Sequence, residues 1–206
     1  MTNFIRLALI GTTAVWLAGC VPSYSLVKPA PTKVAAGTLQ VQPRNAWNRA
    51  PRLPANIARE ESWTQNGLIL DSIGFIGGVE DGAAIVKQQK KDAQKVPVFR
   101  TTMGPQDLVS MIESYYRIRG VSVFQTLSIK PVKFVGEGGV QFDYEFIAAD
   151  EIKRRGRAVM AISQSKLYVM NLNAAAVHYF DAALPEFEVL VASAKVPGRK
   201  ADAAEL

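Results

Sequence analysis

The chain reads Val140-Gln141-Phe142-Asp143-Tyr144-Glu145-Phe146 where its pattern is most regular, with an apolar residue at every second position. In a β-strand, successive side chains point to opposite faces of the sheet. The alternation therefore predicts a strand that packs Phe142, Tyr144 and Phe146 against a core. It predicts that Asp143 and Glu145 face solvent on the other side.

The chain is expected to reverse twice after this strand. The charged segment 150–157 predicts a turn into a strand at 158–163, and a second turn near 164–166 leads to a strand at 167–172. Strands joined by such short connections pair antiparallel. The region from 140 to 172 is therefore expected to form an antiparallel meander of three strands.

A helix is predicted on each side of the meander. The first has Pro105 in its first turn, ends at Gly120 and carries apolar residues at helical spacing, namely Leu108, Met111, Ile112 and Tyr115. A strand at 121–129 follows, and Pro131 is expected to close or kink it. The second helix is expected at 184–194, with Pro185 in its first turn.

The chain before the first helix gives weaker signals. Strands are expected at 37–42 and 68–76, with an irregular segment between them from which Trp47 packs onto the core. The glycines at 77, 78 and 82 match no phosphate-binding motif and indicate a plain turn or bulge. The lysine-rich segment 87–95 is expected to be a solvated loop.

The order of these elements resembles the PsbP-like α/β/α sandwich. The resemblance rests on a helix that ends just before a long meander and on the terminal segment Leu184-Pro185-Glu186-Phe187-Glu188-Val189-Leu190-Val191-Ala192-Ser193-Ala194. It covers about residues 97–196, with 67–85 as a possible earlier hairpin. It implies an α+β fold in which helices flank an antiparallel sheet. Proteins of this fold mostly act as binding or assembly factors, and the resemblance transfers no functional residue.

The N-terminus indicates export. An apolar run at 7–16 is about half as long as a membrane span and is typical of a signal peptide. It ends in Leu17-Ala18-Gly19-Cys20, which resembles a bacterial lipobox. The resemblance implies cleavage before Cys20 and a diacylglyceryl thioether on its sulfur, which with further acylation is a stable anchor. An ordinary secretory signal with an incidental cysteine is the alternative.

These signals divide the chain into four parts. We expect a lipoprotein signal peptide at 1–19, a lipidated cysteine with a proline-rich tether at 20–36, one α+β domain at 37–196 and a polar tail at 197–206. Val21 follows Cys20, and in enteric bacteria a lipoprotein without Asp there is usually sent to the outer membrane. The expected location is therefore the cell envelope, with the protein lipid-anchored and facing the periplasm, at the outer membrane in preference to the inner.

Composition limits the partners. Removing the signal peptide lowers the formal net charge from +6 to +5, because Arg6 is its only charged side chain. This modest excess suits a domain near anionic lipid, whereas nucleic acid is a poor partner behind an export signal. The densest cationic run consists of Lys153, Arg154, Arg155 and Arg157 and is expected to form a solvated turn. Contact of these candidate residues with phosphate on a lipid, a glycolipid or an acidic partner is the alternative.

Catalytic and metal sites have little support. His178 is the only histidine and Cys20 the only cysteine, too few for a typical zinc or iron site, and no cofactor is expected. Ser163 or Ser165 could form a triad with His178 and Asp181, but neither serine lies in a G-x-S-x-G elbow. We expect His178 to be a packed or capping residue, and Asp143 with Glu145 to be strand surface, not a glycosidase pair.

The sequence thus favours an envelope lipoprotein, anchored through Cys20, that binds a partner and catalyses no reaction. The partner is expected to be an envelope protein. Two alternatives remain open. A lipid or glycolipid carrier would need an apolar cavity inside the sandwich, and a hydrolase would need a cleft that gathers His178 or the Asp143 and Glu145 pair.

Overall fold

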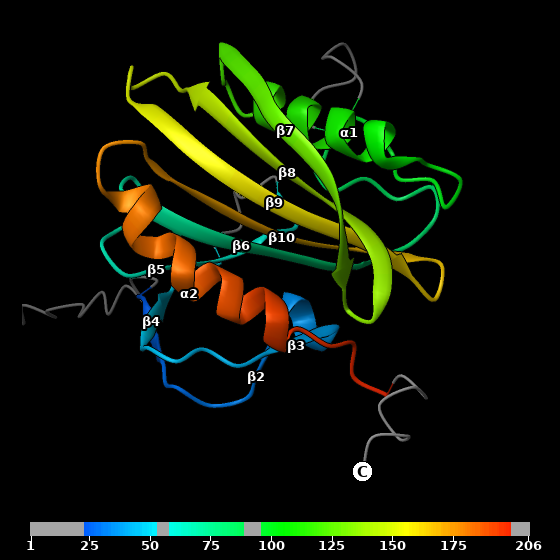
Figure 1. Cartoon of the computed structure of the whole chain (residues 1–206), viewed down its shortest axis with the longest axis horizontal. Helices are drawn as coiled ribbons and strands as arrows, with labels where there is room; N and C mark the ends of the chain where they lie inside the picture. Colours follow the sequence, from blue (N-terminus) through cyan, green and yellow to red (C-terminus); the bar gives the residue numbers. More distant parts are fainter. Residues whose placement is uncertain (1–22, 53–57, 89–95, 199–206) are drawn as a thin grey trace, which may run out of the picture.

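A computed structural model of the chain describes residues 23–52, 58–88 and 96–198. One antiparallel sheet of eight strands runs through the molecule in the order β1-β4-β5-β6-β10-β9-β8-β7 (Figure 1). Its strands are β1 (Ser25–Val27), β4 (Trp47–Arg49), β5 (Glu61–Thr64), β6 (Asp71–Val79), β7 (Val123–Phe134), β8 (Glu137–Ile147), β9 (Lys153–Ser163) and β10 (Lys166–Ala175). The expected meander is confirmed as β8, β9 and β10.

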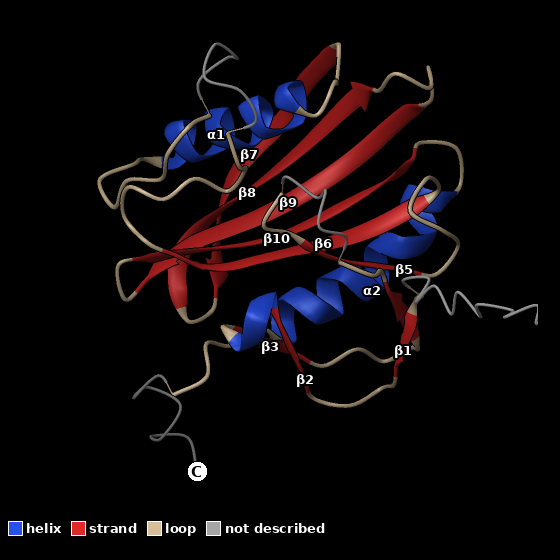
Figure 2. Cartoon of the chain, turned by 180° about the vertical axis from the view of Figure 1, so that it is seen from behind, coloured by secondary structure: helices blue, strands red, loops and turns tan. Residues whose placement is uncertain are grey.

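One helix covers each face of the sheet (Figures 1 and 2). Helix α1 (Pro105–Ile118) shares a buried cluster with Phe142, Tyr144 and Met160, whereas α2 (Tyr179–Ser193) shares a second cluster with Val159 and Met170. A short hairpin of β2 (Thr32–Val34) and β3 (Leu39–Val41), with the 3-10 turn η1 (Ala35–Gly37) between its strands, joins the α2 side. The predicted α+β class, an antiparallel sheet flanked by helices, is confirmed.

Strand β8 has the predicted alternation. Val140, Phe142, Tyr144 and Phe146 are all nearly inaccessible on the α1 face. The opposite face differs from the expectation, because Asp143 and Glu145 are only about one-fifth exposed. Ion pairs with Lys153 and Arg157 of β9, the second of which also binds Glu188 of α2, cover a face that the sequence pattern assigns to solvent.

The N-terminal part of the domain begins earlier than predicted. Ser25–Val27 pairs with β4, and Thr32–Val34 pairs with β3. Val27 and Val34 are buried in the core that α2 covers. The prediction of a tether at 20–36 is therefore wrong from Ser25 onward. The sequence does not reveal β1 and β2, because strands of three residues are too short to show a hydrophobic period.

Strand β7 continues to Phe134 through Pro131, which does not close it. It is an edge strand, so one of its sides pairs with no other strand and tolerates a missing N–H. A bulge between Thr126 and Ser128 shifts the register. Alternation along a regular strand would place Val123, Leu127 and Ile129 on one face, but the bulge interrupts it, and all three side chains are exposed.

Helix α2 begins at Tyr179, before the predicted start at 184, and contains Pro185 in its interior. Pro185 is exposed, so water can satisfy the carbonyl that its missing N–H leaves free. Helix α1 agrees with the prediction, with Pro105 first and Gly120 at φ +89° after its end. Neither helix, within the described part of the chain, is long and apolar enough to cross a membrane.

Candidate functional site

A pocket of about 240 Å³ lies between α1 and the sheet, at the end where β6 begins and β10 ends. Strands β5, β6 and β10 form its floor, and α1 with the residues after it forms a wall. The connections at 65–70 and 148–152 form its rim. Its lining comprises Glu60, Ser62, Leu68, Ile69, Ser72, Tyr116, Arg119, Val121, Phe146, Ala148, Arg154 and Asn173.

Two glycines create the space beneath α1. A Cβ atom on Gly74 would overlap the carboxylate of Glu60, and one on Gly156 would overlap the ring of Tyr144. Both glycines lie on the α1 face, opposite Asn171 and Tyr144 respectively in the strand register. These positions therefore let large polar side chains lie flat against the sheet, where most strand residues would exclude them.

Glu60 organises the charged part of the pocket. Its carboxylate is 5% exposed and accepts hydrogen bonds from the hydroxyl of Tyr115 and, at 3.3 Å, from Nη1 of Arg119. The guanidinium of Arg119 lies 4.9 Å from the centre of the Tyr115 ring. Burial and the charge of Glu60 raise the pKa of Tyr115 well above its usual range, so its hydroxyl stays protonated.

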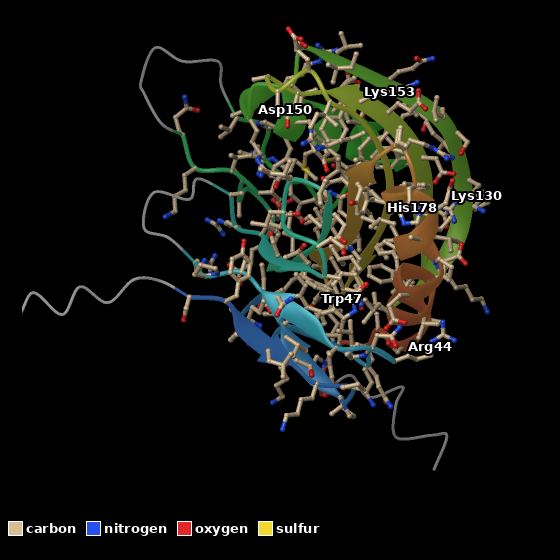
Figure 3. The ribbon with its side chains drawn as sticks, turned by 90° about the vertical axis from the view of Figure 1, so that its left-hand side faces the viewer. Arg44, Trp47, Lys130, Asp150, Lys153 and His178 are labelled. Atoms are coloured by element: carbon tan, nitrogen blue, oxygen red, sulfur yellow. The ribbon has the colours of Figure 1, made fainter. Side chains whose placement is uncertain are left out.

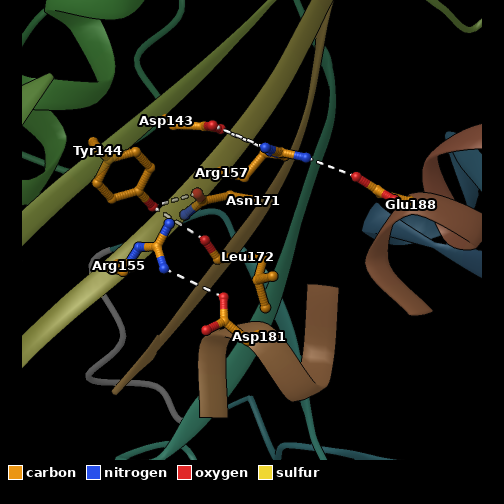
Figure 4. A network of polar contacts seen from close by, with 8 residues as sticks. All are labelled: Asp143, Tyr144, Arg155, Arg157, Asn171, Leu172, Asp181 and Glu188. Carbon is orange, nitrogen blue, oxygen red and sulfur yellow. Dashed lines mark hydrogen bonds and ion pairs between the residues drawn. The ribbon is translucent and has the colours of Figure 1, made fainter. Parts of the chain in front are cut away.

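A closed hydrogen-bond network supports the floor of the pocket. The Tyr144 hydroxyl donates to Oδ1 of Asn171 at 2.5 Å (Figure 4). Nδ2 of Asn171 in turn donates to the Tyr116 hydroxyl at 2.6 Å. The Tyr116 hydroxyl, 2.7 Å from that of Tyr144, is then left to donate to Tyr144 and complete the ring. Burial raises the pKa of Tyr116 to about 12, so these groups are fixed at neutral pH.

Other polar groups in the pocket have no such partners. The side chains of Ser62, Ser72 and Asn173 form no hydrogen bond to any other residue that the structure describes. They come from three neighbouring strands, with Ser72 opposite Asn173 and Ser62 opposite Gly74 in the register. The pocket thus presents hydroxyl and amide groups that are free to bind a ligand.

A second pocket of about 350 Å³ lies between the start of α1 and β7. It is larger, but it is an apolar surface groove beside Ile129, Pro131 and Val140, and the side chains of Gln106 and Lys130 at its border are exposed. It is not the interior apolar cavity that a lipid carrier would need. We therefore place the candidate site in the smaller pocket, where buried polar side chains converge.

The predicted cationic run is part of β9 and not of a turn. Lys153 pairs with Glu145 at 2.7 Å, and Arg155 pairs with Asp181 at 3.3 Å. Arg157 pairs with both Asp143 and Glu188 at 2.7 Å (Figure 4). Carboxylates therefore balance these three cations on the α2 face, opposite the pocket, which leaves little free charge to attract phosphate.

Arg154 differs from its neighbours because its side chain is 7% exposed and reaches the pocket. It binds Asp150 through both terminal nitrogens, at 2.8 and 2.6 Å, and donates to the carbonyl oxygens of Ile69 at 3.1 Å and Ile152 at 3.4 Å. Its hydrogen bond to Asp150 lowers the pKa of that carboxyl to about 2. Arg154 thus ties two connections together.

The proposed hydrolytic residues do not converge. Ser163 and Ser165 lie at the end of β9 where β10 begins, whereas His178 and Asp181 follow the far end of β10. Figure 3 shows His178 at the start of α2. Ser163 instead donates to Glu137 at 3.2 Å. His178 is the N-cap residue of α2 by position, but its side chain is exposed and makes no capping hydrogen bond.

No group of metal-binding side chains occurs among residues 23–52, 58–88 and 96–198. Cys20 and the predicted signal peptide lie outside these residues, as do 89–95 of the expected loop and 199–206 of the expected tail. The lipobox prediction therefore stays a prediction.

The sequence reading missed the polar floor of the pocket, although a signal for it exists. Asn171 and Asn173 lie two positions apart on one face of a strand that is otherwise apolar, and buried amides need partners or a ligand. The neighbouring strand has Ser72 and Gly74 at the same spacing. Glu60 and Arg119 carry no comparable signal, because only the fold brings them together.

Comparisons with known proteins give the fold its context. No known family's sequence profile matches the chain, and no curated protein matches it in sequence. The solution structure of cyanobacterial PsbP (CyanoP) from Synechocystis sp. PCC 6803 is similar, with a TM-score of 0.53 and 12% identity over 92% of this chain and 98% of that one. The similarity therefore extends well beyond residues 97–196.

Two other solved structures are more distant. The Ran-binding protein Mog1p of Saccharomyces cerevisiae has a TM-score of 0.42 at 9% identity, over 85% of this chain and 96% of that one. LpqN of Mycobacterium tuberculosis, described as involved in cell envelope biogenesis, has a TM-score of 0.33 at 13% identity, over 87% of each chain. Neither supports an argument about function.

Element order, sheet topology and the similarity to CyanoP together show that the chain has the PsbP-like fold.

Proposed function

We propose that the chain is a lipid-anchored protein of the bacterial cell envelope, facing the periplasm, whose domain binds a small hydroxyl-rich group and catalyses no reaction. The observation that carries the proposal is the pocket beneath α1, with its free Ser62, Ser72 and Asn173 side chains. The anchor is inferred from the lipobox at Cys20.

The charges of the pocket favour a hydroxyl-rich ligand over an anion. Arg119 and Arg154 each face a carboxylate, so the pocket has little net charge. A phosphate offers mainly acceptors and would be repelled by Glu60, whereas each hydroxyl of a sugar or polyol can both donate and accept. Free serine hydroxyls and an amide match that mixture.

The size of the pocket limits the ligand. Pockets for drug-sized molecules usually measure about 300–1,000 Å³. A volume of about 240 Å³ suits one sugar ring or a polyol of similar size. Such a group could be free in the periplasm or could be the headgroup of a glycolipid.

The protonation states support binding rather than catalysis. Burial raises the pKa values of Tyr115, Tyr116 and Tyr144, and all three hydroxyls keep their protons at neutral pH. Burial alone would lower the pKa of Arg119, but its Tyr115 and Glu60 neighbours outweigh that effect and keep it charged. These groups offer fixed hydrogen bonds, not a proton that shuttles near pH 7.

The test is calorimetric titration of the full-length protein, purified from membranes and held in lipid nanodiscs, with soluble hexoses and disaccharides and with inorganic phosphate. At least one sugar should bind and phosphate should not. Asn173→Leu keeps the branched shape of the side chain but removes its hydrogen-bonding atoms, and should weaken sugar binding about tenfold, since each lost hydrogen bond at a buried site costs about 1–3 kcal/mol.

Asn48→Leu is the matched control, because Asn48 is an exposed asparagine of β4 away from the pocket. Sugar binding that Asn173→Leu leaves unchanged would contradict the proposed site. Mass spectrometry of the same mixtures checks that the sugar is recovered unaltered. Cleaved sugar would instead support the hydrolase alternative.

The anchor has its own test. Cys20→Ser should abolish incorporation of labelled fatty acid, and unchanged labelling would refute anchoring through this residue.

A further inference from the structure

Three connections meet at the end of the sheet beside the pocket. They are 65–70 between β5 and β6, 148–152 between β8 and β9, and 176–178 between β10 and α2. Arg154 bonds to the carbonyls of Ile69 and Ile152, and the amide of Ala176 donates to the carbonyl of Lys153 at 3.0 Å. These hydrogen bonds hold the three connections as one surface, which we call the end surface.

The end surface exposes large apolar side chains from every connection. Val177 is 84% exposed and Ile69 is 64% exposed, and Leu68 and Ile152 are 40% and 37% exposed. Leu68 and Ile69 also border the pocket. A protein rarely gathers exposed residues of this size on adjacent turns unless the surface contacts a partner or a membrane.

The N-terminus points to a membrane. The described chain begins at the same side of the molecule as the end surface (Figures 1 and 2). Four residue steps separate Cys20 from Tyr24, which is 49% exposed and directly precedes β1. A chain extends at most about 3.6 Å per residue, so Cys20 lies within about 14 Å of Tyr24.

This distance is much shorter than the predicted tether would allow. A flexible linker of 16 residues reaches about 20–25 Å when relaxed and far more when extended. Because β1 is part of the sheet, a lipid on Cys20 would hold this side of the domain against the bilayer. The exposed side chains of the end surface would then reach the interface.

The charge of the end surface fits an apolar contact. Lys153 pairs with Glu145, Arg154 with Asp150, and Arg155 with Asp181, so none of these cations needs lipid phosphate as a counter-ion. The contact should therefore depend little on salt, unlike the phosphate contact that is the alternative interpretation of the cationic run.

We infer that the end surface lies on the membrane to which Cys20 is anchored, so that the pocket opens toward lipid headgroups. The inference rests on the proposed anchor and narrows the proposed ligand to the hydroxyl-rich headgroup of a lipid in that membrane.

The experiment places a nitroxide label at single introduced cysteines in the full-length lipoprotein, in membranes from the producing cells. Cys20 is the only natural cysteine and would be blocked by its lipid, so the label reports one position. The positions are Ile69→Cys and Val177→Cys on the end surface. The matched control is Val98→Cys, an exposed apolar residue that pairs with Ala84 beyond the opposite end of β6.

Collisions with oxygen, which partitions into lipid, and with a water-soluble nickel chelate give the depth of each label. The ratio of oxygen to nickel collisions should be several-fold higher at 69 and 177 than at 98, and should not change at high salt. A ratio at 69 or 177 equal to that at 98 would overturn the inference.

Labelled fatty acid, measured on the same samples, separates the two proposals. Incorporation without a raised ratio refutes the end surface and leaves the anchor intact, whereas absent incorporation refutes both. The double variant Leu68→Asp with Ile69→Asp should keep the fatty acid and lower the ratio at 177 to the control value. An unchanged ratio in that variant would also count against the inference.

Discussion

Gly74→Ala tests whether Glu60 depends on a missing side chain. The new Cβ would occupy the position of the Glu60 carboxylate, which must then leave Tyr115 and Arg119. Losing a charged hydrogen bond to the buried Tyr115 hydroxyl costs about 1.5–3 kcal/mol. The half-exposed Arg119 pair adds about 0–1 kcal/mol.

Alanine also has a benefit in a strand, where it is about 0.5–1 kcal/mol more favourable than glycine. The net expected loss for Gly74→Ala is therefore about 0.5–3.5 kcal/mol. In a Glu60→Ala background the obstacle is gone, so the same substitution should stabilise the fold by about 0.5–1 kcal/mol. The sign of the effect should reverse.

Equilibrium urea unfolding of the four proteins in this double-mutant cycle measures the coupling. Gly138→Ala is the control, since a Cβ there meets nothing within 4 Å, and it should be neutral or slightly stabilising in both backgrounds. If Gly74→Ala costs the same with and without Glu60, the two residues are independent and this account of the pocket is wrong.

Three further predictions concern the groups around the pocket. Gly156→Ala should destabilise the fold by at least about 2 kcal/mol by overpacking against the Tyr144 ring, and thermal unfolding equal to that of the parent protein would contradict this. Burial raises the pKa of Tyr116 from 10 to about 12, so the stability that its protonated hydroxyl contributes is complete below pH 10 and is lost as the pH rises toward 12. Ultraviolet titration should show this tyrosine ionising near pH 12. Ionisation near pH 10 in the folded protein would refute its burial. Arg154→Met should raise the pKa of Asp150 from about 2 toward 3.8, because the hydrogen bond from Arg154 is the main cause of the lowered pKa. The stability that this pair contributes is present above about pH 4 and is lost as the pH falls toward 2. An NMR titration that finds the same Asp150 pKa in both proteins would show that Arg154 is not its partner.

The long elements could be predicted from the sequence because their periods are clear. The alternation around Phe142 and the helical spacing after Pro105 each extend over several repeats, and both elements form as expected. Short strands carry no such period, so the sequence predicts a tether where β1 and β2 form. Pro131 is predicted to close or kink its strand and Pro185 to lie in the first turn of its helix, yet both lie inside longer elements, at exposed positions that tolerate a missing N–H.

The pocket could be predicted only in part. The spacing of Asn171 and Asn173 marks a polar floor, because two amides on one face of a buried strand need partners. The positions of Glu60 and Arg119 depend on which strands become neighbours, and no local pattern encodes that. The cations of β9 show the converse, since a dense charge run in the sequence becomes a set of paired residues once β8, α2 and the connection before β9 supply carboxylates.

A photo-activatable residue in place of Leu68, at the rim of the pocket, tests the central claim most directly in living cells. After irradiation, mass spectrometry of the purified protein should find an adduct with a molecule that carries a hydroxyl-rich group, and Asn173→Leu should reduce its yield. An adduct with a protein alone would favour the assembly role expected from the sequence. That result, or a hydroxyl-rich adduct that Asn173→Leu leaves undiminished, would contradict binding in this pocket.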